Sequence, residues 1–344
     1  MKAIRSQFFI ACFLVCCFAV FITGAPAARA AEKCKKTKYV TISNGVATAS
    51  TMMVAAKWAE VMSKEIPCVT ASATTGSFVA NALTVNQKRH TIGIADPNTL
   101  YYTSRGVIKK FKGKETKNLR FINAMHHGAF HIFTRKDSPI KSVKDIATYP
   151  CRNVMVVSKL GATYQWVSRI FKAYGSSFED LEKRGGSLAY VNYTNAIGLM
   201  KDGQADILLI HTPAPSSVIL DIDSNPGVRF LEMEPEIRQK LTKMIPGMVE
   251  VTIPGGTYKN MPKDYKTIGV YFHNFTHKDI SEEFIYNATK VFWKHEKDFQ
   301  QLAAWGSGIQ LKTALRGMNI PIHPGAERYY KEIGAKIPNP NWPW

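Results

Sequence analysis

The chain is poor in cysteine, which excludes most metal and disulfide frameworks. It has six cysteines in 344 residues, and three of them precede residue 20. The other three are Cys34, Cys68 and Cys151. Their spacing is not that of metal ligands, so a zinc site is not expected. Cys34 precedes the first expected strand and Cys68 opens the second, so they are a candidate disulfide if those strands are parallel neighbours, with Cys151 left as a buried apolar residue.

Long apolar runs are absent beyond the N-terminus, so no membrane span is expected in the mature chain. At the N-terminus, two basic residues precede an apolar run over residues 8–22, and a stretch of small residues follows up to Ala30. This is the pattern of a secretory signal peptide, residues 1–30, cleaved near Ala30, and it predicts a periplasmic protein. A lipid-anchored form would need a small residue before an acceptor cysteine, which only Ala11 and Cys12 approach.

Acidic residues are also few. The chain has 26 acidic and 45 basic residues, a net charge of +19, which falls to +16 without Lys2, Arg5 and Arg29. Such a field favours anionic partners, namely acidic solutes, an anionic membrane surface or nucleic acid. Because the lysines are scattered and form no basic helix, a surface charged for solubility is the other interpretation. Export argues against nucleic acid.

Catalytic motifs are missing as well. The sequence has no G-x-S-x-G turn, no P-loop and no dinucleotide fingerprint, so no catalytic residue and no cofactor are predicted. The local histidine cluster, His126, His127 and His131, would need further ligands to hold a metal, so no metal site is predicted. His323 precedes Pro324 and Gly325, where a hydrogen bond that stabilises a turn is the favoured interpretation.

What the sequence does contain is an alternation of strands and helices, which indicates parallel α/β layers. Strands are expected at residues 39–42, 69–73 and 91–95, with helices at 51–64 and 78–86 between them. Strands at 119–124 and 131–134 follow. The pattern restarts with a short helix at 142–147, strands at 153–157, 188–190 and 207–210, and helices at 163–174 and 195–202. Residues 249–262 look like turns, 267–272 a returning strand and 281–305 one long helix.

Two α/β units with a late returning strand predict two lobes joined by crossing strands. Lobe I comprises residues 31–133 and 270–344, and lobe II residues 134–269. In open α/β sheets, ligands lie beyond the carboxyl ends of the strands, at the N-termini of helices. Small and hydroxylated residues occupy those positions here: Thr48, Ser50, Thr75, Gly76, Ser77, Asp96, Gly161, Thr163 and Thr212. They suit a carboxylate held by backbone N–H groups, although helix capping alone explains any single one of them.

Four segments resemble the TAXI-type solute receptors of TRAP transporters, which belong to the type II periplasmic binding proteins. Residues 42–50 occupy the place of that family's glycine-rich first loop, and residues 75–81 resemble its T-G-G-S-V-x-N loop. Residues 158–163 are similar to the loop that opens the first helix of the second lobe. Residues 323–330, His-Pro-Gly-Ala-Glu-Arg-Tyr-Tyr, with Gly334, resemble the C-terminal H-P-G-A-x-x-Y-Y signature. The resemblance extends from about Lys38 to Gly334.

The resemblance implies a two-lobed α/β fold with a hinge and a central ligand cleft, binding a small carboxylate-bearing solute for the permease subunits of a TRAP-type membrane transporter. The implied ligand-binding residues are Thr48, Ser50, Thr75, Ser77, Asn81 and Asp96 in lobe I, and Gly161, Thr163, Thr212 and Pro213 in lobe II. Thr163, at a helix start, is the strongest single candidate, and Asp96 either binds an ammonium group or caps the loop before Pro97. The sequence departs from the family where Thr51 and Met52 replace paired tyrosines and where Ser77 and Phe78 replace Gly-Ser, so the cleft is expected to lose an aromatic wall.

Two other functions stay open. A sensory subunit would report ligand binding to a membrane signalling protein instead of delivering cargo. An exported enzyme on the same fold would need a nucleophile with a base in reach, and the sequence offers no such pair.

Overall fold

The computed structural model describes residues 34, 37–45, 47, 49–107, 112–113, 115–157 and 162–339. The predicted signal peptide, Thr48 and Gly161 lie outside the described residues. The described residues from 37 to 339 belong to one compact unit, in which all the elements below lie. Within the described part of the chain, no helix has both the length and the apolar character that a membrane crossing requires.

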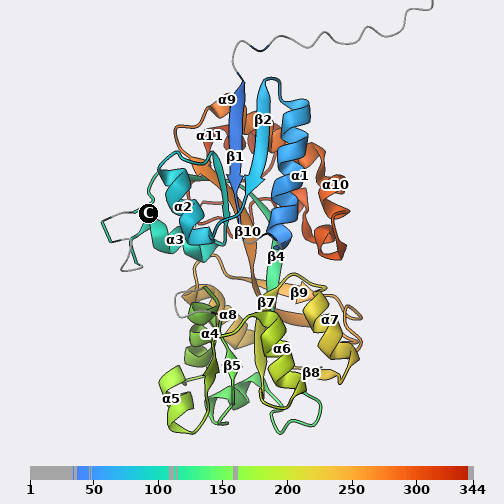
Figure 1. Ribbon diagram of the computed structural model, residues 1–344. Helices are drawn as coiled ribbons and strands as arrows, with labels where there is room; N and C mark the ends of the chain where they lie inside the picture. Colours follow the sequence, from blue (N-terminus) through green and yellow to red (C-terminus); the bar gives the residue numbers. More distant parts are fainter. Residues whose placement is uncertain are drawn as a thin grey trace, which may run out of the picture. The chain divides into compact units, whose positions relative to one another are not determined.

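Lobe I begins with the predicted alternation of strands and helices (Figure 1). Its first elements are β1 (Lys38–Ser43), α1 (Ser50–Glu65), β2 (Val69–Thr74), α2 (Phe78–Asn86), β3 (Ile92–Ala95) and α3 (Pro97–Ser104). β1 lies between β2 and β3 and pairs with both in parallel. On α1, the apolar residues Val54, Trp58 and Met62 recur at helical spacing and are buried. The carboxyl ends of the three strands therefore lie at one edge of the sheet, next to the helix starts.

Two long antiparallel strands connect the lobes. β4 (Leu119–Arg135) and β10 (Tyr265–His277) pair with each other from Ala129 opposite Gly269 to Leu119 opposite His277. In lobe I the sheet order is β2-β1-β3-β10-β4, whereas in lobe II β4 pairs with β7 and β8, and β10 pairs with β9. The strands change neighbours at about residues 126–128 and 270–272, and the lobe boundaries at 133/134 and 269/270 stay a prediction.

Lobe II contains a 3-10 helix at Val143–Ala147 and the elements β5 (Val154–Met155), α4 (Ala162–Ala173), α5 (Phe178–Lys183), β6 (Leu188–Ala189), α6 (Tyr193–Lys201), β7 (Leu208–Thr212), α7 (Ser217–Ser224), β8 (Val228–Phe230), α8 (Pro235–Met244) and β9 (Val249–Ile253). The chain then returns to lobe I through β10 and adds α9 (Glu282–Lys294), α10 (Glu296–Gln300), 3-10 turns at Ala304–Gly308 and Leu311–Thr313, and α11 (Pro324–Glu332). The expected turn segment 249–262 thus opens with a strand, and the expected helix 281–305 is broken at His295, whose ring lies 2.5 Å from Glu65 and 2.6 Å from Asp298.

Each sheet is covered by apolar side chains on both faces. On β4, Phe121 and Ile122 point to opposite faces of the lobe I sheet and belong to different apolar clusters. Further along the same strand, Ile132 and Phe133 do the same in lobe II. Each lobe is thus an α/β layered body with its own core.

Candidate functional site

A cavity of about 720 Å³ is lined by residues of both lobes. Five predicted site residues lie in its wall, namely Ser50, Asp96, Thr163, Thr212 and Pro213. Three others, Thr75, Ser77 and Asn81, are not in the wall, and Thr48 and Gly161 lie outside the described residues. The structure therefore brings together half of the predicted set, from segments more than 150 residues apart in the sequence.

Helix N-termini converge on this cavity. The first residues of α1, α2, α4, α6 and α7 line it, and so does Asp96, the N-cap of α3. Side chains cap α2, α3 and α6, whereas the N-caps of α1 and α7, Ala49 and Ser216, make no side-chain hydrogen bond to the N–H groups of their helices. α1 belongs to lobe I and α7 to lobe II, so both lobes present helix N–H groups and the positive ends of helix dipoles to the cavity.

Two of the three predicted residues outside the wall, Ser77 and Asn81, hold the loop next to it. Asn81 is buried and donates from Nδ2 to the carbonyl oxygens of Asn44 and Ile94, each at 2.9 Å, which ties the ends of β1 and β3 together. Ser77 caps α2 by accepting from the Ala80 N–H. Gly76 permits this packing, because a Cβ there would lie 2.5 Å from Asn81 Oδ1. The family-like loop therefore shapes the first lobe.

Asp96 is fully buried and caps α3. Its carboxylate accepts from the Thr99 N–H at 2.9 Å and from the Thr99 hydroxyl at 2.6 Å. Burial raises the pKa of Asp96, and the hydrogen bonds from Thr99 act against that rise. Both oxygens are thus bound within the protein, which favours the capping interpretation over an ammonium site.

A serine and a histidine that the sequence did not connect are hydrogen-bonded at the cavity. Ser50 Oγ lies 2.8 Å from His126 Nε2, although the two residues are 76 positions apart. Burial lowers the pKa of His126 to about 3, and its Nδ1 has no hydrogen-bond partner in the structure. A general base works best with a pKa near the operating pH and needs a group that orients it. The pair therefore has the geometry of a nucleophile and base without the proton affinity for that reaction.

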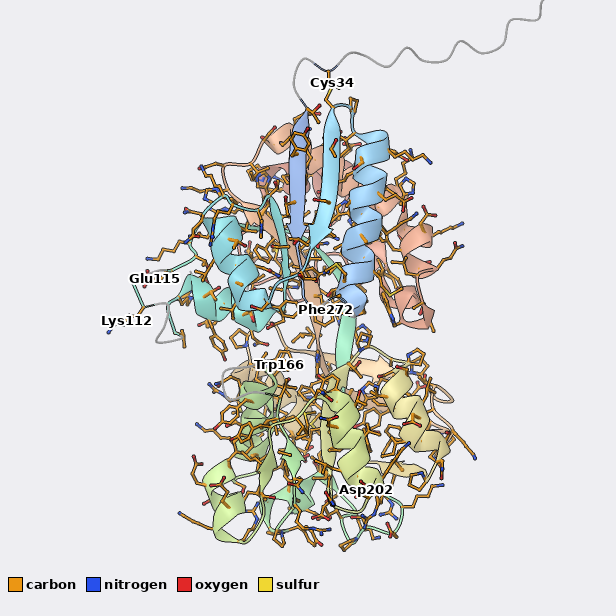
Figure 2. All side chains as sticks on the ribbon, in the orientation of Figure 1. Cys34, Lys112, Glu115, Trp166, Asp202 and Phe272 are labelled. Carbon is orange, nitrogen blue, oxygen red and sulfur yellow. The ribbon has the colours of Figure 1, made fainter. Side chains whose placement is uncertain are left out.

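The cavity wall is aromatic, contrary to the expectation drawn from Thr51 and Met52. Thr51 does line the cavity, but Met52 does not. Aromatic rings come instead from other segments: Phe78, Trp166, Tyr193, His211, Phe272 and Trp305. Figure 2 shows Phe272 on the connecting strand β10 in lobe I and Trp166 on α4 in lobe II, near the junction of the lobes. Trp166, Phe272 and Trp305 were not predicted, because they lie within a helix, a connecting strand and a 3-10 turn and not in a loop at a strand end.

Two other histidines, His131 and His323, are hydrogen-bonded within the fold. His131 is buried, with Nδ1 3.0 Å from the Ala129 carbonyl oxygen and Nε2 2.9 Å from the Tyr258 hydroxyl. Among the residues that the structure describes, no group of three His, Cys, Asp or Glu side chains is placed to hold a metal ion. His323 accepts from the Gly325 N–H through Nδ1 at 3.1 Å, so the predicted turn hydrogen bond is confirmed.

The C-terminal signature packs inside lobe I. Gly325, at the start of α11, allows a close approach to α9, because a Cβ there would lie 2.2 Å from the Glu282 carbonyl oxygen. Tyr330 is buried and its hydroxyl accepts from Trp293 Nε1 at 2.9 Å. None of these residues lines the cavity. The most specific segment of the resemblance therefore reports the fold and not the solute.

A family comparison agrees with this architecture. A model of the NMT1-like family matches residues 39–334. The chain belongs to the NMT1-like family. Solved structures similar to this NMT1-like protein include a TctC solute binding protein from Polaromonas, at 11% identity over 78% of this chain and 86% of that chain, with a TM-score of 0.52. A structure described as a periplasmic transporter is 12% identical over 88% and 94%, with a TM-score of 0.50.

These two likenesses show the fold, which is the two-lobed α/β fold of periplasmic binding proteins, as predicted. The aliphatic sulphonate binding protein SsuA from Escherichia coli is also similar, at 14% identity over 90% of this chain and 94% of that chain, with a TM-score of 0.49.

Proposed function

We propose that this NMT1-like protein is an extracytoplasmic receptor that captures a small carboxylate-bearing solute and delivers it to a TRAP-type membrane transporter. The observation that carries the proposal is the cavity at the junction of the lobes, with helix N-termini from both lobes in its wall. A carboxylate accepts hydrogen bonds from free helix N–H groups and is stabilised by the helix dipoles. Hydroxyl groups of Ser50, Thr51 and Thr212 line the same cavity.

The Ser50–His126 pair supports an anionic ligand. Because burial keeps His126 neutral, one of its ring nitrogens carries hydrogen and the other does not. If Nε2–H donates to Ser50 Oγ, the Ser50 hydroxyl hydrogen is free to donate to the solute. This tautomer also leaves Nδ1 as an unpaired acceptor instead of an unpaired buried donor. We infer that His126 positions the Ser50 hydroxyl as a donor.

The proposed class of transporter rests on the TAXI-like segments and on the fold that this protein shares with a solved solute binding protein. The TctC protein is, by its description, a solute binding protein, and it shares this fold at a TM-score of 0.52. The TAXI-like C-terminal signature lies in the core of lobe I, where α11 packs on α9. These observations support a receptor function, and the TRAP-type partner is the finer part of the proposal. Uptake by vesicles that hold such a permease should require this protein.

Ligand capture would close the two lobes over the solute. We place the hinge at residues 126–128 and 270–272, where β4 and β10 change neighbours and their register shifts. The bend is not placed at Thr134 and Thr267, because their hydroxyls donate to the carbonyl oxygens of Asp206 and Phe130 and so hold both residues in place. A closed form would be selected because only then do both lobes contact the solute.

A thermal-shift screen tests the receptor function. The mature protein, unfolded and refolded to remove bound solute, is heated with acetate, succinate, 2-oxoglutarate, glutamate, benzoate or sucrose at millimolar concentrations. A ligand at 100 times its Kd stabilises the folded state by about 2.7 kcal/mol, so a receptor for acids gives a clear rise in Tm with at least one acid and none with sucrose. No rise in Tm with any of the acids would contradict the proposal. A rise with sucrose alone would contradict the inference that the solute carries a carboxylate.

A further inference from the structure

The rings of the cavity form a connected series that runs from one lobe to the other. In lobe II, Trp166 packs on His211 with ring centroids 4.6 Å apart. His211 lies 6.3 Å from Phe272 of β10, and Phe272 lies 5.9 Å from Phe78 in lobe I. All four residues line the cavity. A flat apolar group placed in the cavity would therefore meet ring surfaces from both lobes.

Trp305 adds a second aromatic surface. It follows α10 in a 3-10 turn and packs against His126 in a tilted arrangement, with centroids 4.5 Å apart and an angle of 33° between the rings. His126 in turn contacts Phe272 at 5.2 Å. Aromatic pairs gain free energy beyond the area that they bury when rings meet face to edge or in offset stacks. The wall can thus select a planar ring over a saturated body of the same size.

Among the described residues, no lysine or arginine lines the cavity. The carboxyl group in the wall, Asp96, is bound to Thr99, and the histidines His126 and His211 are buried. If the uncapped N-termini of α1 and α7 bind one carboxylate together, a second charge on the solute would lie against the apolar rings of the described wall. An ionised group moved from water to such a surface without a partner is strongly disfavoured.

We propose that the solute is a planar aromatic monocarboxylate, with its ring against Trp166 and Phe272 and its carboxylate at the N-termini of α1 and α7. This inference rests on the proposed receptor function and specifies its substrate class. The sequence-based expectation of a dicarboxylate such as 2-oxoglutarate, or of glutamate, would then not hold for this protein. In this proposal, the polar part of the wall binds one anion, and the aromatic part favours a planar ring over a saturated group.

Isothermal titration of the solute-free mature protein tests the class with four probes. Benzoate is compared with cyclohexanecarboxylate, which lacks the planar ring, with benzamide, which lacks the charge, and with 2-oxoglutarate, which adds a second carboxylate. We expect benzoate to bind at least tenfold more tightly than each of the others. Equal binding of benzoate and cyclohexanecarboxylate would contradict the preference for an aromatic ring. Tighter binding of 2-oxoglutarate would contradict the preference for a single carboxylate. Both results leave the receptor function intact, whereas no binding of any acid would remove both proposals.

A matched pair of variants tests the role of Trp166. Trp166→Phe and Trp166→Leu both lose the hydrogen bond from the indole Nε1 to Asn98 Oδ1, which is 2.7 Å long, but only the leucine variant loses the ring. We expect the Kd for benzoate to rise about three- to tenfold from the phenylalanine to the leucine variant. Tyr39→Leu is the control, because Tyr39 is 77% exposed and lies outside the cavity wall. Equal Kd values for the two Trp166 variants, with both folded by circular dichroism, would contradict the inference.

Discussion

Thr51 is the residue at which stability and binding are expected to change in opposite directions. Its side chain is 2% exposed and lines the cavity, and Oγ1 has no hydrogen-bond partner in the structure. A buried hydroxyl without a partner costs about 1–3 kcal/mol. Such a cost is consistent with a group that is kept for a ligand.

We expect Thr51→Val to leave the Tm of the solute-free protein unchanged or higher, and to weaken solute binding about tenfold, as the loss of one hydrogen bond to a charged group does. Thr163→Val is the comparison, because the Thr163 hydroxyl hydrogen-bonds Tyr193 and its removal should lower the Tm. Thermal melts and titration of both variants measure the two effects. If Thr51→Val lowers the Tm as much as Thr163→Val does, the Thr51 hydroxyl is structural.

Two cysteines near the N-terminal end of the fold, Cys34 and Cys68, take part in disulfide bonding. Each is disulfide-bonded in the structure, whereas Cys151 is free and buried. Their pairing with each other stays a prediction, supported by the parallel pairing of β1 with β2 and by the Lys38 N–H, which donates to the Cys68 carbonyl oxygen at 2.7 Å.

Peptide mapping of the mature protein without reduction should yield one peptide that contains Cys34 and Cys68. A bridge that closes a loop of this length stabilises the fold by about 3–4 kcal/mol, so the Cys34→Ser/Cys68→Ser double variant should melt at a lower temperature. Recovery of both residues as free thiols, or of either one linked to Cys151, would contradict the pairing.

At the scale of the elements, histidines make the connecting strands sensitive to acid. Burial lowers the pKa of five histidines on β4, β7 and β10 to about 3 or 4; four of them are buried and His127 is partly buried: His126, His127, His131, His211 and His273. In the unfolded chain their pKa is about 6.5. The unfolded state therefore binds more protons between these values, and the stability that the neutral histidines contribute is present above pH 6.5 and is lost as the pH falls toward 4.

We expect the free energy of unfolding to fall between pH 7 and pH 5, by up to about 1.4 kcal/mol per pH unit for each of these histidines. His295 titrates in the opposite direction: burial acts to lower its pKa, but Asp298 and Glu65 raise it overall, so it offsets part of the loss. Urea denaturation at several pH values measures the slope. His131→Gln should reduce that slope by about one proton, and an unchanged slope in this variant would contradict the assignment.

Sequence patterns predicted the elements whose signals are local. The helical spacing of Ala55, Ala59 and Met62 marks α1, and alternating strands and helices give the parallel part of both lobes. β9 was missed because Pro254, Gly255 and Gly256 dominate the segment, although the alternation Val-Glu-Val-Thr-Ile before them indicates a strand. The length of β4 was missed because Gly128 and neighbouring histidines interrupt its apolar pattern, while β10 stabilises the strand through pairing that a local pattern does not reveal.

The candidate site divides in the same way. Loops at strand ends can be found from the order of the elements, and Ser50, Asp96, Thr163 and Thr212 from those loops lie in the cavity wall, while their role in ligand binding stays a prediction. The aromatic wall depends on tertiary packing, since Phe272 lies within a connecting strand and Trp305 in a turn that follows α10. The Ser50–His126 hydrogen bond likewise depends on how α1 packs beside β4, which no spacing in the sequence expresses.

For the whole molecule, the central question is whether solute binding brings the lobes together. Asn98 of α3 already bridges them away from β4 and β10, since it donates to the Pro246 carbonyl oxygen at 2.6 Å and accepts from Trp166. On the cavity side, Met53 of α1 and Leu220 of α7 are 41% and 43% exposed and belong to opposite lobes. If closure buries these large apolar side chains, their burial lowers the free energy of the closed form.

A double-cysteine variant, Met53→Cys with Leu220→Cys, tests closure, because a disulfide between the two new cysteines forms faster when the lobes come together. The native Cys151 does not interfere, because it is buried and burial raises the pKa of its thiol to about 12. We expect the acid that gives the largest thermal shift to increase disulfide formation between the two new cysteines at least threefold. The control pair, Leu220→Cys with Tyr39→Cys, should not respond, since Tyr39 lies outside the cavity wall. A ligand that binds but leaves both rates unchanged would show that capture does not close the lobes, and the transporter would then have to recognise the bound solute itself or another surface change.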